Sequence, residues 1–257
     1  MMEHNKIYNE DCIDTMNRMD FNSIDLIVTS PPYFNAREYS QYENLKYYLD
    51  EMNDVFQKAF DVLKEGKICV INISPIIVAR KKRSESSKRI PLPFYYVPMM
   101  EKIGFEFLED IIWKKPEGSA FNRNGGFFVH RKPIAYKPNI VTEYILVFRK
   151  KTKLLIDNFL KNESLVKDGY ERTNVWEINP ETKSWHSAPF PIELCSKIIS
   201  YYSYENDLIF DPFMGSATTA IACLDNKRKF IGSELDDNYF HKSLDRLRVH
   251  QSQLTMF

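Results

Sequence analysis

Two kinds of segment alternate along the chain: short apolar runs, and longer stretches whose apolar residues recur with a helical period. The short runs lack strict polar alternation, which is typical of strands buried on both faces of a sheet. They predict strands at Ile24–Thr29, Lys67–Ile73, Phe105–Trp113, Glu143–Arg149, Leu208–Phe210 and Lys229–Ser233. The periodic stretches predict helices at Asn44–Leu63, Leu92–Ile103, Pro191–Tyr202, Ser216–Asp225 and Asp237–Val249.

This alternation predicts an α/β fold with a mostly parallel sheet and helices on both of its faces. The length of 257 residues suits one large domain or a core with an inserted lobe. Residues 114–138, which hold three of the eight glycines, and the polar residues 150–187 interrupt the alternation. We interpret both stretches as elaborations on the sheet.

The sequence Ser30-Pro31-Pro32-Tyr33 follows directly on the first of the predicted strands. Two successive prolines offer no N–H to a sheet and fix φ, so the strand must end there in a rigid turn. Ligands of open α/β sheets bind at the carboxyl ends of strands. A hydroxyl, two stiff carbonyls and an aromatic ring can hold a flat molecule that carries an amino group. The alternative for Tyr33 is a core or rim aromatic, since the chain has 15 tyrosines.

A second strand and turn, Leu208–Thr219, ends in small residues at the start of a predicted helix. Small residues let the turn approach a ligand closely, and a helix N-terminus offers free N–H groups. The next strand ends at Glu234, where nucleotide-binding α/β folds place an acid that accepts hydrogen bonds from ribose hydroxyls. The alternative for Glu234 is a solvated strand end. This loop comes late in the chain, so we expect a circularly permuted sheet, which neighbouring termini allow.

The net charge is zero, but the charges are unevenly distributed. Between Arg80 and Lys153 the chain carries 17 Lys and Arg against 7 Asp and Glu, so the remainder of the 35 of each sign is 18 basic and 28 acidic. This asymmetry indicates an anionic partner for the basic region. The densest run, 80–89, fits a solvated loop and a nucleic-acid contact equally well.

Four cysteines lie far apart and form no Cys-x-x-Cys pair, so neither a zinc site nor a disulfide framework is expected. We interpret them as reduced core residues. The chain start does not resemble a signal peptide and no apolar run is long enough to span a membrane, so we expect a cytoplasmic protein without a metal.

Four strings together resemble the beta group of site-specific DNA amino-methyltransferases, which depend on S-adenosylmethionine. Ser30–Tyr33 resembles the group's catalytic Ser/Asp-Pro-Pro-Tyr motif, and Asp211–Thr219 resembles Asp-Pro-Phe-x-Gly-Ser-Gly-Thr-Thr. Asn9–Cys12 resembles Gly-Asp-Cys, and His186–Pro191 resembles His-x-Ala-Pro-Phe-Pro. In this group the catalytic motif precedes the target-recognition region and the cofactor loop comes last. The resemblance covers about residues 6–72 and 185–245.

The resemblance implies a single methyltransferase domain over residues 1–257, with a circularly permuted Rossmann-like sheet and an inserted target-recognition region. The expected parts are a catalytic part at 6–79 and 91–113, a basic loop at 80–90, target-recognition elements at 114–138 and 150–185, and a cofactor-binding part at 186–249.

The resemblance also implies a set of site residues. The catalytic residues would be Ser30, Pro31, Pro32 and Tyr33. The S-adenosylmethionine site would comprise Asp11, Cys12, His186, Phe190, Asp211, Pro212, Phe213, Gly215, Ser216, Thr218, Thr219, Glu234 and Leu235. Candidate DNA contacts, chosen from the basic region, are Arg80, Lys81, Lys82, Arg83, Lys88, Arg89, Lys114, Lys115, Arg123, Arg131 and Lys132.

The implied reaction is methyl transfer to an exocyclic amine of a base flipped out of duplex DNA. Ser30 favours N4 of cytosine, because in this group Ser-Pro-Pro-Tyr mostly accompanies cytosine-N4 activity and Asp-Pro-Pro-Tyr mostly accompanies adenine-N6 activity. Adenine N6 stays open, as do an inactive DNA-binding module and an RNA or protein methyltransferase. A restriction-modification context, a homodimer and a companion endonuclease are further expectations.

Two residues depart from the group's pattern. Ala217 replaces the second glycine of the cofactor motif, and Glu10 replaces the glycine of Gly-Asp-Cys. An alanine costs free energy if the turn requires a positive φ at that position. We expect cofactor binding to survive the replacement.

Overall fold

The computed structural model describes residues 2–35, 41–78, 88–119, 140–152, 170–181, 185 and 190–254. Its helices are α1 (Cys12–Asn17), α2 (Leu45–Val62), α3 (Leu92–Ile103), α5 (Ile192–Tyr202), α6 (Thr218–Asp225) and α7 (Asp237–Leu254), with a 3₁₀ turn at Glu117–Ser119. Its strands are β1 (Lys6–Tyr8), β2 (Ile24–Thr29), β3 (Leu63–Ile73), β4 (Ile76–Val78), β5 (Lys88–Ile90), β6 (Phe105–Lys114), β7 (Thr142–Lys150), β8 (Val175–Glu177), β9 (Leu208–Asp211) and β10 (Lys229–Ser233).

Eight of the described strands form one sheet in the order β1-β10-β9-β2-β3-β7-β6-β8. The strands from β1 to β3 are parallel, as is the β6–β8 pair, whereas β7 is antiparallel to both of its neighbours. The expected mostly parallel sheet is therefore confirmed. Strand β9 lies beside β2 although 182 positions separate Thr29 from Asp211, which is the expected late placement of the cofactor turn.

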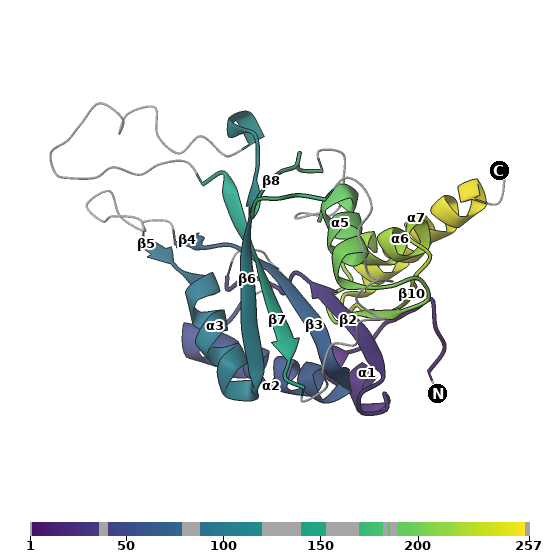
Figure 1. Cartoon of the computed structure of the whole chain (residues 1–257), viewed down its shortest axis with the longest axis horizontal. Coiled ribbons are helices and arrows are strands. Elements are labelled where there is room, and N and C mark those ends of the chain that lie inside the picture. Colours follow the sequence, from purple (N-terminus) through teal and green to yellow (C-terminus); the bar gives the residue numbers. More distant parts are fainter. Residues whose placement is uncertain are drawn as a thin grey trace, which may run out of the picture.

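The sheet separates two apolar cores. Alternate residues of the central strands enter opposite cores, so that Ile27 of β2 packs with α1, α2 and α3, while Leu26 packs with α5, α6 and α7. Figure 1 shows α2 and α3 on one side of the sheet and α5, α6 and α7 on the other. Because both faces of the central strands are buried, residues of either orientation are apolar, and the strands appear in the sequence as continuous apolar runs.

Most predicted elements have the expected bounds, and the missed ones are short. β2, β10 and α3 match their predictions residue for residue, whereas β3 begins at Leu63 rather than at Lys67. Sequence reading missed α1, β1, β4, β5 and β8, because three to six residues carry no measurable period. β8, inside the predicted elaboration 150–187, is the edge strand of the main sheet beside β6.

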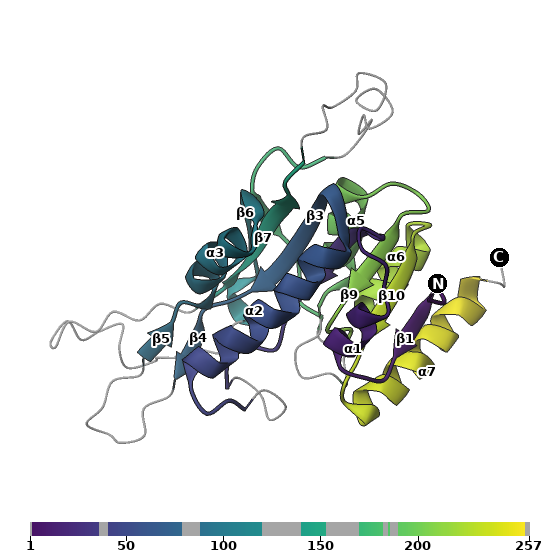
Figure 2. The same ribbon diagram turned by 90° about the horizontal axis from the view of Figure 1, so that it is seen from below.

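The first strand and the last helix adjoin, and Figure 2 shows β1 and α7 side by side. This proximity is what a permuted chain order requires. All four cysteines are buried free thiols, as predicted. Among the described helices, none combines the length and the apolar composition that crossing a bilayer demands.

Candidate active site

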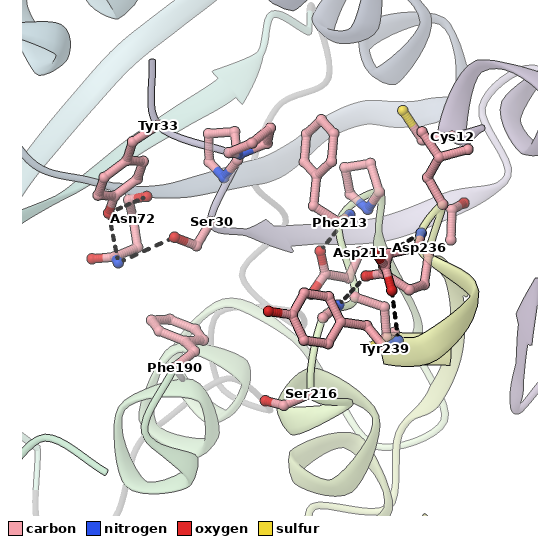
Figure 3. Close-up of a pocket in the computed structure, with 18 of the residues that line it drawn as sticks. Cys12, Ser30, Tyr33, Asn72, Phe190, Asp211, Phe213, Ser216, Asp236 and Tyr239 are labelled. Atoms are coloured by element: carbon pink, nitrogen blue, oxygen red, sulfur yellow. Dashed lines mark hydrogen bonds between the residues drawn. The ribbon is translucent and has the colours of Figure 1, made fainter. Parts of the chain in front are cut away.

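A cleft of about 1480 Å³ opens at the carboxyl ends of β2, β9 and β10 (Figure 3). The catalytic set and the cofactor set predicted from the sequence both line it, apart from His186, which lies outside the described residues. The lining residues of these two sets are Asp11, Cys12, Ser30, Pro31, Pro32, Tyr33, Phe190, Asp211, Pro212, Phe213, Gly215, Ser216, Thr218, Thr219, Glu234 and Leu235. Segments from both ends of the chain thus form one cavity.

The turn after β2 is held by a polar network. The Tyr33 hydroxyl contacts Glu143 Oε2 at 3.0 Å, and the Asn72 amide Nδ2 donates to the same carboxylate oxygen at 2.8 Å. The same Nδ2 lies 3.5 Å from Ser30 Oγ and 3.4 Å from the Tyr33 hydroxyl (Figure 3). Burial, and then the Glu143 charge, raise the pKa of Tyr33 well above its ordinary value, so the phenol stays protonated.

Asp211 ends β9 as a buried carboxylate. Its Oδ1 accepts from Thr29 Oγ1 at 2.7 Å and from the Phe213 amide at 3.0 Å, and its Oδ2 accepts from Thr219 Oγ1 at 2.6 Å. Burial raises the pKa of Asp211 to about 6, although these three hydrogen bonds oppose the shift. A buried acid without a cationic partner in the described structure is suited to a positively charged ligand group.

The turn after Asp211 does require positive φ. Gly215 has φ 54°, and Ala217 has φ 62° in the left-handed region. The alanine methyl is fully buried there. A left-handed conformation costs an L-residue about 1–2 kcal/mol, so the strained alternative considered for Ala217 is the one that the chain adopts.

Glu234 ties this turn to β10. Its Oε2 accepts from the Gly215 amide at 2.8 Å and its Oε1 accepts from the Asp236 amide at 2.9 Å. Burial raises the pKa of Glu234, and the two amides oppose the shift. Each oxygen keeps a free lone pair that a ligand hydroxyl can use.

The other end of the cofactor region is built on α1. Asp11 is the N-cap of α1, accepting from the Ile13 amide at 2.7 Å. Burial raises the pKa of the Cys12 thiol to about 12, so this thiol is neutral. Glu10, the departure from the group's glycine, accepts from Thr15 Oγ1 and pairs with Arg18, which gives the carboxylate a structural role.

Sequence reasoning did not place Asn72, Glu143 or Arg246 in the site, and it assigned Lys115 to DNA contact. Asn72 lies in β3, Glu143 near the start of β7 and Lys115 just after β6, and all three line the cleft. Arg246 of α7 donates to Ser216 O at 2.8 Å and to Thr218 Oγ1 at 3.1 Å, holding the cofactor turn from outside. The polar Asn72 inside the apolar run Cys69–Ile73 could have been noticed in the sequence as a candidate site residue. The positions of the other three in the site become visible only in the folded structure.

The candidate DNA contacts divide into three groups. Lys88 and Arg89 are exposed on β5 of a two-stranded ribbon with β4. Lys114 pairs with Glu177 at 2.6 Å on the surface, whereas Lys115 pairs with Glu143 inside the cleft. Lying outside the described residues are Arg80, Lys81, Lys82, Arg83, Arg123, Arg131 and Lys132.

The family model of the DNA methylases that modify N6 or N4 matches residues 24–245. The chain belongs to this family. The resemblance predicted from the four strings is thereby confirmed: by sequence and by fold the chain belongs with the beta-group DNA amino-methyltransferases. Among curated relatives, the type II beta methyltransferase M.BslI of Bacillus sp. (strain NEB-606) is 34% identical over 94% of this chain. M.BglII of Bacillus subtilis is 26% identical over 91% of it.

The chain spans only 27% of the length of M.BslI and 66% of M.BglII. Among solved structures, TTHA0409 of Thermus thermophilus, described as a putative DNA modification methylase and complexed with S-adenosyl-L-methionine, has a TM-score of 0.76 and 26% identity, covering 95% of this chain and 93% of its own. The cytosine-N4-specific PvuII DNA methyltransferase has a TM-score of 0.72 at 22% identity, covering 95% and 86%, and supports the fold alone.

Proposed function

We propose that this chain transfers a methyl group from S-adenosylmethionine to the N4 amine of a cytosine flipped out of duplex DNA. The observation that carries the proposal is the shared cleft, in which the Ser30–Tyr33 turn faces the Asp211–Thr219 turn. A methyl acceptor and a methyl donor bound by these two turns would lie in one cavity, as direct transfer requires.

The cofactor end fits S-adenosylmethionine in charge and in hydrogen bonding. The buried Asp211 suits the ammonium group, and the free lone pairs of Glu234 suit the ribose hydroxyls. Ser233 also lines the cleft, and its buried Oγ has no hydrogen-bond partner in the described structure. When bound, the cofactor supplies an electrophilic methyl group on a sulfonium.

The acceptor end acts by positioning. The Ser30 hydroxyl and the Pro31 carbonyl would accept the two amine hydrogens, turning the nitrogen lone pair toward the methyl group. Flipping the base costs a few kcal/mol, of which stacking on Tyr33 would recover roughly 1–3 kcal/mol. The contacts of the Tyr33 hydroxyl with Asn72 and Glu143 hold the ring in place for this purpose.

The choice of cytosine rests on Ser30 and on the tendency of the Ser-Pro-Pro-Tyr form within the group. Either amine offers the same two hydrogens, so adenine N6 is the alternative. Nucleoside mass spectrometry on DNA incubated with the pure protein separates the two, because N4-methylcytosine is expected and N6-methyladenine would replace it. RNA methylated in preference to DNA would overturn the proposal, and absence of cofactor binding would favour an inactive DNA-binding module.

Ser30→Ala tests the role of the hydroxyl. We expect turnover to fall about 100-fold with little change in cofactor affinity, because the Ser30 hydroxyl would contact the acceptor amine rather than the cofactor. Steady-state methylation and calorimetric titration with S-adenosylmethionine measure the two effects. The matched control is Ser200→Ala, at an exposed serine of α5. Methylation at the original rate would remove Ser30 from the mechanism.

A further inference from the structure

The wall of the cleft behind Ser30 carries a partly buried ion pair that the four family strings do not include. Glu143 and Lys115 form this pair, with 14% and 21% of their side chains exposed. The Lys115 ammonium also lies 4.5 Å from the centroid of the Trp113 ring, which fixes its position. Removing both charges from water costs free energy, so we expect a pair kept beside the acceptor turn to contribute to the chemistry there.

The negative end of the pair faces Ser30. Glu143 Oε1 takes the ammonium, while Oε2 takes the Asn72 amide at 2.8 Å and the Tyr33 hydroxyl at 3.0 Å. The same Asn72 Nδ2 is 3.5 Å from Ser30 Oγ, so the carboxylate oxygen lies no more than about 6 Å from that hydroxyl, within strong Coulomb range of a partly buried site. Asn72 and Tyr33 carry no charge, so the negative charge of this hydrogen-bonded network is that of the Glu143 carboxylate.

During methyl transfer a positive charge moves from the sulfonium to the amine held at Ser30. The carbon–sulfur bond breaks and a carbon–nitrogen bond forms, so the sulfonium becomes a neutral thioether and the amine becomes cationic. The amine then loses one N–H proton to solvent. A fixed negative charge near the amine stabilises the transition state more than the neutral ground state.

Resting on the proposed function, we propose that the Glu143 carboxylate is the counter-charge of the acceptor pocket, stabilising the positive charge that arises on the amine held at Ser30. Glu143 acts through Asn72 and Tyr33 and is therefore a positioning residue. Lys115 holds the carboxylate in place from the other side. This assigns Lys115 to the pocket of the flipped base, whereas its charge alone had predicted a phosphate contact.

The test compares single-turnover methylation rates at saturating S-adenosylmethionine on unmethylated mixed-sequence duplex DNA. In Glu143→Gln we expect a rate about tenfold lower with unchanged cofactor affinity. Glu143→Asp, which keeps the charge, should recover part of the rate. Glu177→Gln, in the exposed pair with Lys114, is the matched control and should behave as wild type.

Lys115→Met provides a second measurement that does not depend on how E143Q folds. The titratable groups that contact Glu143 in the described structure are Lys115, after β6, and Tyr33, after β2. Without the ammonium, Glu143 Oε1 loses the partner that holds it, so the single-turnover rate should fall, again with unchanged affinity for S-adenosylmethionine.

The outcomes separate the two proposals. No methylated nucleoside from the wild type would overturn the proposed function. Methylation by the wild type, with E143Q equal to it in rate, would overturn only the role of Glu143. An unchanged rate in K115M would overturn that role as well, and weaker DNA binding with a flatter salt dependence would return Lys115 to a phosphate contact.

Discussion

At the scale of single residues, two buried aspartates at opposite edges of the sheet have unlike surroundings. Asp25, at the opposite edge of the sheet, contacts Lys64 and Lys67, and its pKa is lowered although burial alone would raise it. Asp211 has hydroxyl and amide partners only, and burial raises its pKa. An ionised Asp211 therefore reduces the stability of the empty protein, which is what a group reserved for a cationic ligand does.

Asp211→Asn should raise stability and weaken cofactor binding. The folded-state pKa of about 6 exceeds the ordinary value of 3.8, so the folded state loses stability as pH rises between these values, by about 3 kcal/mol at neutral pH. An asparagine can keep all three hydrogen bonds if Nδ2 donates to Thr219. Urea unfolding at pH 7 should show about 1–3 kcal/mol more stability, fading near pH 4, and calorimetry should show weaker S-adenosylmethionine binding.

Asp25→Asn is the control of opposite sign, because Asp25 has cationic partners and its removal should lower stability at pH 7. Unchanged cofactor affinity in Asp211→Asn would exclude Asp211 as the ammonium partner.

At the scale of elements, the cofactor turn is held by close packing between β9 and β10. Met214 lies over Gly232, and a Cβ added to Gly232 would stand 2.1 Å from Met214 Cε and 3.2 Å from Met214 Cγ. The Met214 amide also bonds to Ser233 O at 2.8 Å. A methyl group at position 232 must therefore displace the Met214 side chain, including Cγ close to the backbone of the turn.

Gly232→Ala should disturb cofactor binding through this contact. We expect a loss of about 1–3 kcal/mol in stability from overpacking and a weaker affinity for S-adenosylmethionine, measured by thermal unfolding and calorimetry. Met214→Ala should cost less in the Gly232→Ala background than in the wild type, because it frees the space that the new methyl needs. Additive effects of the two substitutions would show that Met214 does not transmit the change.

At the scale of the whole molecule, the Ser30–Tyr33 turn and the Asp211–Thr219 turn meet because the parallel strands before them end at the same edge of the sheet. Lys114 and Lys115, at the end of β6, lie at this edge, whereas Arg149 and Lys150 end β7 at the opposite edge. Lys115 also lines the cleft, so part of the basic region borders the site, an arrangement suited to an anionic polymer.

Replacing Arg80–Arg83 by alanines should weaken DNA binding and flatten its salt dependence, by about 0.9 in logarithmic slope for each phosphate that is no longer neutralised. Fluorescence anisotropy on mixed-sequence duplex DNA at several salt concentrations measures both. The control replaces Lys227 and Lys229, which lie at the amino edge of β10, away from the cleft. Identical affinity and slope in the four-alanine variant would make this run a solvated loop.

How well each helix or strand could be predicted depended on the length of its apolar pattern in the sequence. β2, α3 and β10 were predicted to the residue because their apolar patterns are uninterrupted, whereas β1 and β8 are too short to show one. The motifs located the catalytic and cofactor turns because each consists of adjacent residues with fixed backbone requirements. Glu143 and Lys115 belong to no string, and their meeting depends on the antiparallel register of β6 and β7.

By itself, the sequence determined the fold class, the family, the late cofactor turn and the residues of both turns, since each depends on local backbone chemistry or on short contiguous patterns. Only the tertiary structure decided that Ala217 is strained, that Asp211 is buried without a cation in the described structure, and that a carboxylate stands behind Ser30. These properties depend on burial and on distances between segments far apart in the chain, which the packing of the sheet alone sets.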